Sequence, residues 1–342
     1  MVEVTPPRST GTLATTRRPL PWPSGRPFRI LSIDGGGIKG ILPATLLGEL
    51  ERRYLGNRSI GAHFDLIAGT STGGIIALGL AHGMTAREIG ALYLDKGDRI
   101  FPVDGPFSAL LRKLRGLITT AYDREPLKAE LTRIFGETQL GEAQNRLCIP
   151  AFEGTHGEPL IYKTPHHPDY RADQYETMRD VALATSAAPT YLRALENNGY
   201  VLVDGGMVAN NPIMVGLVDA LACNDIPRHG VEIVSLGCGS SPFALSEQHH
   251  AGGQLQWRHA LLAAMDASSR SALGQAYLLV GKDRVLRIDP PSSDKPIDLA
   301  DFRRARDELP TTATALADAY GDMIAQRFLH STVQPAPMPG RK

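Results

Sequence analysis

The stretch "SIDGGGIKG", residues 32–40, stands where an apolar run, residues 28–33, passes into a helix-like segment, residues 41–54. Three of its glycines match the spacing G-x-G-x-x-G of dinucleotide-binding loops. A strand that runs through glycines into a helix gathers free backbone N–H groups at the positive end of the helix dipole. The stretch therefore predicts a site for negative charge, and the neighbouring sequence must decide which kind.

Two nucleotide-binding interpretations fit the neighbouring residues poorly. A Rossmann unit needs an acidic residue at the end of its second strand, whereas Asp65 opens the next predicted strand, residues 64–71. A P-loop needs G-K-[ST], but Lys39 precedes Gly40 and no such triplet occurs. A non-enzymatic nucleotide-binding module that uses the Gly35 loop stays open as an alternative.

The second strand ends in "GTSTGG", residues 69–74, which contains the pattern G-x-S-x-G. A strand before this pattern and a helix after it are the context of a nucleophile elbow. Gly69 and Gly73 leave room for the sharp turn, and a helix expected to start near Gly74 points its positive end at Ser71. We predict that Ser71 is a catalytic nucleophile; the alternative is that it only caps the helix.

A serine nucleophile gives the first glycine stretch a chemical role. Acyl transfer needs backbone N–H groups aimed at the oxygen that becomes negatively charged. Gly35, Gly36 and Gly37 offer such groups without side chains in the way, so we predict that they form the oxyanion hole. Lys39 is expected to add positive charge near the hole, unless it is a solvated surface lysine.

The candidate base is Asp204, in "YVLVDGG", residues 200–206. It follows an apolar strand, and active sites of open α/β sheets lie at the carboxyl ends of strands. The alternative is a turn aspartate, because Asp-Gly is a common turn pair. Ser71 and Asp204 together predict a two-residue catalytic site.

An ordinary α/β-hydrolase with a Ser-Asp-His triad is the enzymatic alternative, and it needs a histidine after Asp204. None of the candidates lies in a recognisable glycine-flanked loop after a strand. These candidates are His229, His249, His250, His259 and His330. His166 and His167 come too early in the chain and are expected to shape a loop.

Short apolar strands alternate with amphipathic helices from about residue 27, which predicts a mainly parallel sheet covered by helices on both faces. We interpret residues 27–330 as one domain, residues 1–26 as a flexible tail and residues 331–342 as a loose tail. Further predicted strands are residues 146–153, 159–164, 200–206, 231–239 and 284–289, and further predicted helices are 74–83, 86–97, 255–280 and 311–329.

Composition excludes several classes of protein. Lys plus Arg and Asp plus Glu both number 36 in the 342 residues, so the basic excess of a general nucleic-acid binder is missing. The three cysteines are far apart, which predicts buried free thiols in a reducing compartment and no metal site. No apolar run reaches the roughly 18 residues of a membrane span, and the N-terminus lacks an apolar signal region. We therefore expect a cytoplasmic protein.

Residues 107–118 have apolar side chains at helical spacing and three basic residues towards the other side. A basic amphipathic helix can rest on an anionic membrane, which would give peripheral association with its inner face. The alternative is a surface helix packed on the core or on a subunit partner.

In ordered combination, "DGGGIKG" (34–40), "GTSTGG" (69–74), "ATSAAPTYL" (184–192) and "DGG" (204–206) resemble the patatin-like phospholipase family. The resemblance implies a three-layer α/β/α fold and hydrolysis of carboxylic esters of membrane phospholipids, without a cofactor, by a Ser71–Asp204 dyad. The Gly35–Gly37 amides would form the oxyanion hole. Many members carry Arg where Lys39 stands, and Lys lacks the planar fork of Arg.

The family also contains bacterial anti-phage effectors that cyclic dinucleotides such as cyclic GMP-AMP switch on. The chain is similar to these in length and in having little beside the domain. The resemblance therefore implies a cyclic dinucleotide activator as a hypothesis, with a phospholipid membrane surface as substrate. A homodimer is a further hypothesis, and no nucleic acid polymer is expected as a partner.

Overall fold

A computed structural model describes residues 5–8, 17–23, 25–102, 121–239, 260–293, 295–333 and 338–340. The amphipathic segment at residues 107–118 lies outside these residues, as do His249, His250 and His259.

The described residues form an eight-stranded sheet in the order β5-β6-β3-β2-β1-β7-β8, with β4 also paired to β3. The strands are β1 (Phe28–Ile33), β2 (Leu66–Gly69), β3 (Arg146–Glu153), β4 (Glu158–Lys163), β5 (Leu195–Asn197), β6 (Tyr200–Asp204), β7 (Val231–Leu236) and β8 (Val285–Ile288). Strands β3, β2, β1, β7 and β8 run parallel, while β4, β5 and β6 are antiparallel to their neighbours.

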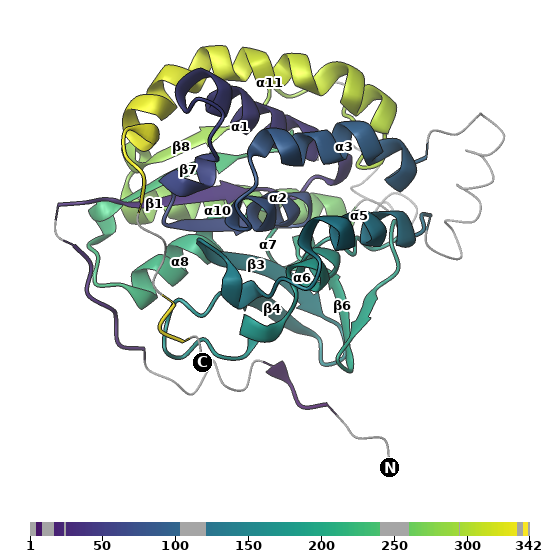
Figure 1. Cartoon of the computed structure of the whole chain (residues 1–342), viewed down its shortest axis with the longest axis horizontal. Helices are drawn as coiled ribbons and strands as arrows, with labels where there is room; N and C mark the ends of the chain where they lie inside the picture. The colour runs from purple at the N-terminus through teal and green to yellow at the C-terminus, as the bar shows by residue number, and fades with distance from the viewer. Residues whose placement is uncertain are drawn as a thin grey trace, which may run out of the picture.

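Helices cover both faces of the sheet (Figure 1). The helices are α1 (Ile41–Tyr54), α2 (Thr72–Ala81), α3 (Ala86–Ile100), α5 (Glu125–Phe135), α6 (Met178–Thr185), α7 (Gly206–Ala209), α8 (Ile213–Cys223), α10 (Ala260–Val280) and α11 (Phe302–Ile324). The two faces have separate apolar cores, one under α1, α2, α3 and α11 and one under α8 and α10. The three-layer α/β/α fold with a mainly parallel sheet is thus confirmed.

Strand β1 shows how the apolar sequence feeds both cores. Successive side chains of a strand point to opposite faces. Phe28 and Ile30 accordingly join the core beside α8 and α10, whereas Leu31 and Ile33 join the core beside α1 and α2. Because both faces are covered, the strand contains no exposed position, and its side chains are all buried.

Several predicted elements are confirmed and others need correction. Helix α1 spans the predicted residues, and the Thr85–Glu88 capping box starts α3. Helix α2 begins at Thr72, ahead of the predicted Gly74. Helix α11 begins at Phe302 instead of residue 311, with Pro310 inside it, because Phe302 and Leu309 extend its buried face. The antiparallel direction of β6 and the short strand β5 were not predicted, because residue preferences do not reveal strand direction.

The described parts of both predicted tails contact the domain. Arg8 forms ion pairs with Asp173 at 2.7 Å and with Glu176 at 3.1 Å. Leu20 forms an isolated parallel bridge with Asn224, and the Gly340 N–H donates to the carbonyl of Pro165 at 2.8 Å. The proposed domain boundaries stay predictions.

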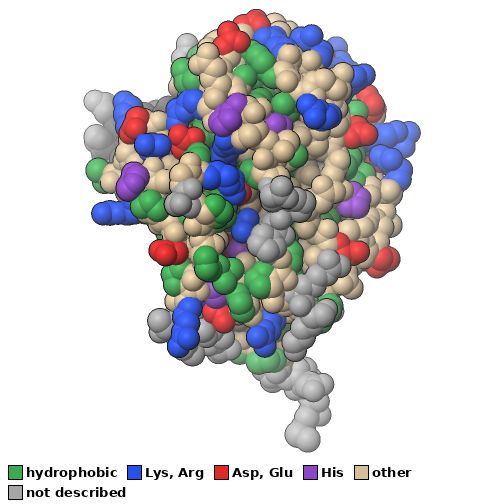
Figure 2. Space-filling model, turned by 60° about the vertical axis from the view of Figure 1, so that its left-hand side comes forward, with side chains coloured by type: hydrophobic (Ala, Val, Ile, Leu, Met, Phe, Trp, Pro, Cys, Tyr) green, Lys and Arg blue, Asp and Glu red, His purple; other side chains and the backbone are tan. Residues whose placement is uncertain are grey.

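The surface and the cysteines agree with the composition. Figure 2 shows one face of the molecule, on which both basic and acidic side chains are present. Cys148, Cys223 and Cys238 are buried and free, as expected. Among the described helices, none has the length and apolar character that crossing a bilayer requires.

Candidate active site

Ser71 lies at a sharp turn between β2 and α2. Its backbone has φ 53° and ψ −120°, a conformation that an L-residue adopts only at a cost. A side chain on Gly69 would collide with the carbonyl of Gly73, and one on Gly73 would collide with the carbonyl of Ile33. The strained serine between two obligatory glycines is the local geometry that a nucleophile elbow requires.

The side chain of Ser71 is turned away from the helix that follows it. Ser71 occupies the N-cap position of α2, but its side chain forms no capping hydrogen bond. It lies instead close enough to the carboxylate of Asp204 to act on the pKa of that group. The interpretation of Ser71 as a helix cap therefore does not describe what its hydroxyl does.

Asp204 reaches Ser71 by a route that the sequence reasoning did not foresee. Strand β6 is antiparallel to β3, so its own carboxyl end points in the opposite direction to those of the parallel strands. Asp204 pairs with Ala151 in register, while the last pairing of the shorter β2 is between Ala68 and Cys148. Because β2 stops early, the end of β6 lies beside the turn that carries Ser71.

The Asp204 carboxylate is buried and accepts few hydrogen bonds. The Gly206 N–H donates to its Oδ1 at 2.6 Å, and the hydroxyl of Ser71 lies nearby. Burial raises the pKa of Asp204 to about 6, and these two neighbouring groups only partly oppose that rise. A carboxylate with such a pKa is ionised at neutral pH and is a stronger base than an exposed aspartate.

Thr185, at the end of α6, holds the elbow and the base in place, and the sequence reasoning assigned it no role. Its Oγ1 accepts from the Ser71 N–H at 3.0 Å and donates to the carbonyl of Pro150 at 2.6 Å. Its carbonyl accepts from the Gly205 N–H at 3.0 Å. Thr185 lies inside the family-like stretch "ATSAAPTYL", which was the available signal.

The glycine stretch forms a short 3-10 helix, Gly37–Gly40, that leads directly into α1. The Gly35 N–H donates to the carbonyl of Asn210 at 3.0 Å, which takes it out of the predicted oxyanion hole. Among the described residues, no acceptor is paired with the N–H of Gly36 or Gly37. Gly37 has φ +58°, which favours glycine.

Lys39 lines the cavity that Ser71 and Asp204 also line, and its side chain has a backbone partner. Its Nζ donates to the carbonyl of Gly239 at 2.7 Å. The lysine is therefore bound across the loop that follows β7, instead of being a solvated surface side chain.

Ser71, Asp204 and the glycine stretch line one cavity of about 840 Å³. This volume lies within the usual range of small-molecule binding sites. Part of the wall is apolar and part carries charge. The apolar part includes Ile38, Ile75, Tyr93, Ile100, Phe101 and Leu127, and the charged part includes Asp34, Asp266, Arg270, Arg287 and Asp289.

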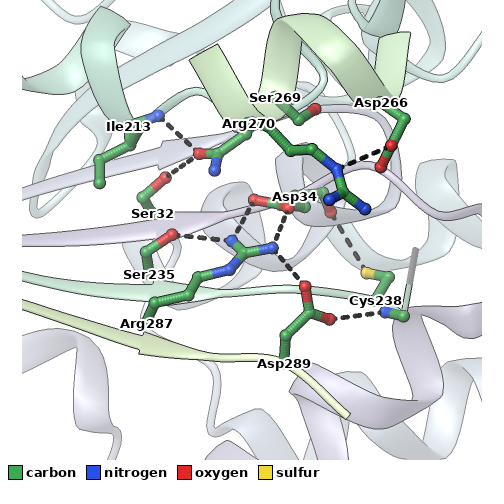
Figure 3. A network of polar contacts seen from close by, with 12 residues as sticks. Ser32, Asp34, Ile213, Ser235, Cys238, Asp266, Ser269, Arg270, Arg287 and Asp289 are labelled. Carbon is green, nitrogen blue, oxygen red and sulfur yellow. Dashed lines mark hydrogen bonds and ion pairs between the residues drawn. The ribbon is translucent and has the colours of Figure 1, made fainter. Parts of the chain in front are cut away.

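A buried ion pair beside the glycine stretch was missed entirely. Arg287 of β8 binds both carboxylate oxygens of Asp34, which follows β1 (Figure 3). Burial raises the pKa of Asp34 to about 6, although Arg287 acts to lower it. The available signal was weak: a charged residue, Arg287, between the apolar residues Leu286 and Ile288 of the predicted strand.

The described histidines lie away from the cavity. His229 precedes β7 at the amino end of the sheet, and His330 contacts Arg29 at 2.7 Å after α11. His166 hydrogen-bonds Asp219 at 2.7 Å in a separate buried cluster that also contains Cys223. That cluster has metal-ligand composition, but the ammonium of Lys163 already lies 2.8 Å from Asp219 and supplies the countercharge.

A parallel α/β sheet that presents a strained serine beside a cavity is the architecture of serine hydrolases of the α/β type. The family model described as patatin-like phospholipase matches residues 31–217, and the chain belongs to this family. As a member of it, the chain is a phospholipase-type hydrolase.

Three relatives are named cGAMP-activated phospholipase. The one from Pseudomonas aeruginosa is 34% identical, over 88% of this chain and 89% of its own length. The one from Escherichia coli is 38% identical over 64% of each chain. The one from Vibrio cholerae is 36% identical, over 66% of this chain and 68% of its own.

Proposed function

We propose that the protein cleaves carboxylic esters of membrane phospholipids with Ser71 as nucleophile and Asp204 as base, and releases free fatty acids. The observation that carries this proposal is the Ser71 side chain, held by a strained turn against a buried Asp204 at the positive end of α2. The glycine stretch faces the same cavity. The apolar wall suits an acyl chain.

In the first half-reaction the Ser71 oxygen attacks the ester carbonyl carbon and gives its proton to Asp204. The N–H groups of Gly36 and Gly37 stabilise the negative oxygen of the tetrahedral intermediate. As the intermediate collapses, the proton passes to the departing lysolipid oxygen and the acyl group stays on Ser71. Water, deprotonated by Asp204, then attacks the acyl-enzyme; as the bond from the acyl carbon to the Ser71 oxygen breaks and the fatty acid leaves, Asp204 returns the proton to that oxygen.

A serine-directed phosphonate tests the nucleophile. We expect the phosphonate to label Ser71 covalently, and Ser71→Ala to lose both the label and the release of fatty acid from phosphatidylglycerol vesicles. A nucleotide-binding module would take no label. If the phosphonate labels another serine and the Ser71→Ala variant keeps its activity, Ser71 is not the nucleophile.

We further propose that a cyclic dinucleotide activates this hydrolase and that the hydrolase acts at the cytoplasmic face of the membrane. Three relatives at 34–38% identity with cGAMP in their names support the first point. The purified protein should release little fatty acid from vesicles alone and much more with cyclic GMP-AMP. Equal activity with and without a panel of cyclic dinucleotides would contradict this regulation and leave the hydrolase assignment intact.

A further inference from the structure

Arg287 joins the ends of the three neighbouring parallel strands β1, β7 and β8 through the contacts drawn in Figure 3. It pairs in register with Ser235 of β7, and Asp34 follows β1. Its Nη1 donates to Asp34 Oδ1 at 3.0 Å and to Ser235 Oγ at 2.9 Å. Its Nη2 donates to Asp34 Oδ2 at 2.7 Å and to Asp289 Oδ2 at 2.7 Å.

The network continues from Asp289 back to the glycine stretch. Asp289 Oδ1 accepts from the Gly239 N–H at 3.0 Å, and the Gly239 carbonyl accepts from Lys39 Nζ at 2.7 Å. The Lys39 backbone N–H in turn donates to the carbonyl of Gly36 at 3.1 Å. Arg287 is therefore connected to the glycine stretch from two sides, through Asp34 at its start and through Lys39 at its end.

These contacts fix the direction of the peptide groups in the stretch. The Asp34 carbonyl accepts from the Cys238 thiol at 3.4 Å, and the N–H of the same peptide group, on Gly35, donates to Asn210. In a trans peptide the carbonyl and the next N–H point in opposite directions. Holding the Gly36 carbonyl towards the Lys39 N–H therefore turns the Gly37 N–H the other way.

Arg287 has little capacity left for a ligand. Each of its two terminal nitrogens carries two hydrogens, and each already donates to two protein oxygens. A substrate phosphate or carbonyl would have to displace Asp34, Ser235 or Asp289. The residue is thus built to hold other protein groups.

We propose that Arg287 is a positioning residue, which sets the aim of the glycine N–H groups at the reacting oxygen by clamping Asp34 and Asp289. This inference rests on the proposed function, because it assigns Arg287 to the oxyanion hole of that reaction. A misplacement of about 1 Å can cost on the order of 10² in rate. Loss of the clamp should therefore lower kcat and leave KM nearly unchanged.

The competing explanation is that Arg287 only neutralises a buried carboxylate and so stabilises the fold. The two explanations differ for the double variant Asp34→Asn/Arg287→Met, which removes both charges. A merely stabilising pair predicts that this variant recovers both thermal stability and kcat relative to Arg287→Met. A positioning role predicts that stability recovers while kcat stays low.

The experiment measures kcat and KM on a small soluble ester, with the folded fraction of each variant taken from circular dichroism. We expect a loss in kcat of about 10-fold in Arg287→Lys, which keeps the charge but not the fork, and on the order of 10² in Arg287→Met. Asp289→Asn should lose about 10-fold and decides the matter if Arg287→Met does not fold. A folded Arg287→Lys or Asp289→Asn with kcat within twofold of the parent overturns the inference.

Arg284→Lys and Arg284→Met are the matched controls. Arg284 precedes β8 and binds Glu232 of β7 at 3.3 Å, so it joins two of the same strands at their opposite ends. Both variants should keep the parental kcat. Ser71→Ala in the same assay separates the two levels: if it retains hydrolysis, the proposed function fails. If hydrolysis by the parent depends on Ser71 but the Arg287 and Asp289 variants have the parental kcat, the proposed function stands and only the positioning role of Arg287 is refuted.

Discussion

Asp204 and Asp219 are both buried carboxylates, but they have very different surroundings. Asp219, on α8, accepts from Lys163 at 2.8 Å, from the Tyr170 hydroxyl at 2.7 Å and pairs with His166 at 2.7 Å. Burial acts to raise its pKa, but His166 and Lys163 outweigh this and hold the pKa of Asp219 well below its usual range. Asp204 has only the Gly206 N–H and Ser71, and its pKa rises to about 6.

Burial alone does not make a carboxylate reactive. A carboxylate surrounded by donors and a cation keeps its charge and takes up no proton near neutral pH. A buried carboxylate with few donors and one hydroxyl neighbour can accept that neighbour's proton. Asp204, which has few donors, lines the cavity, whereas Asp219, which has several, is buried away from it.

The first prediction concerns the two side chains of the proposed dyad. Ser71→Ala and Asp204→Ala should each lower kcat by at least about 10³-fold, with little further loss in the double variant, because the two side chains act as a unit. His229→Ala and His330→Ala are the controls and should keep most activity. Single-turnover and steady-state hydrolysis of a soluble ester measure these effects. A loss of several orders of magnitude in a folded histidine variant, including His249, His250 or His259, would establish a triad instead.

The second prediction concerns the buried cluster around Asp219. Asp219→Ala leaves the Lys163 ammonium without its carboxylate, and breaking a buried pair costs about 3–5 kcal/mol of unfolding free energy. The activity of the folded fraction should stay near that of the parent, because Asp219 does not line the cavity. Urea unfolding measures the first quantity.

Asp318→Ala is the matched control for that measurement. Asp318 pairs with Arg53 at 2.7 Å, but its side chain is 65% exposed, so the loss should stay below about 1 kcal/mol. An Asp219→Ala protein as stable as this control would show that the buried cluster contributes little.

The third prediction concerns the glycine stretch. A side chain on Gly36 would collide with the side chain of Cys238 and displace the backbone, so Gly36→Ala should lose on the order of 10² in kcat. The companion Gly36→Ala/Cys238→Gly removes the collision and should recover part of the rate. Gly274→Ala, in α10 with open space around it, is the control and should change nothing. Parental kcat in folded Gly36→Ala would contradict the assignment of this loop.

The sequence predicted well what short stretches determine. The turn at Ser71 and the helix start after Gly36 depend on neighbouring residues, so their patterns are visible locally. Asp204 was predicted from a supposed parallel strand, whereas β6 is antiparallel and reaches Ser71 because β2 is short. The position of Asp204 therefore depends on strand lengths and directions that residue preferences do not encode.

Contacts between distant residues were beyond the sequence. Arg287 and Asp34 are 253 positions apart, and nothing in "RVLRID" names the partner of its arginine. The same holds for His166, which was expected only to shape a loop and is a member of the Asp219 cluster. Such pairs follow from which strands become neighbours in the sheet, and that order is set by the whole chain.

The last prediction concerns how the rate of hydrolysis depends on pH. Asp204 must be ionised to accept the Ser71 proton, and its pKa is about 6. At a pH equal to this pKa half of the carboxylate is protonated, so kcat/KM should be half-maximal near pH 6, level off about one unit higher, and fall about tenfold per unit well below it. Asp219, with its lowered pKa, stays ionised through this range and contributes nothing to the fall.

Asp34 also has a pKa of about 6, so the profile of Asp34→Asn must be recorded beside that of the parent. If the acid limb belongs to Asp204, it persists in Asp34→Asn at a lower absolute rate. An acid limb that disappears in that variant would belong to the Arg287 clamp instead. A profile that stays flat to pH 5 in the parent would mean that Asp204 is not the base.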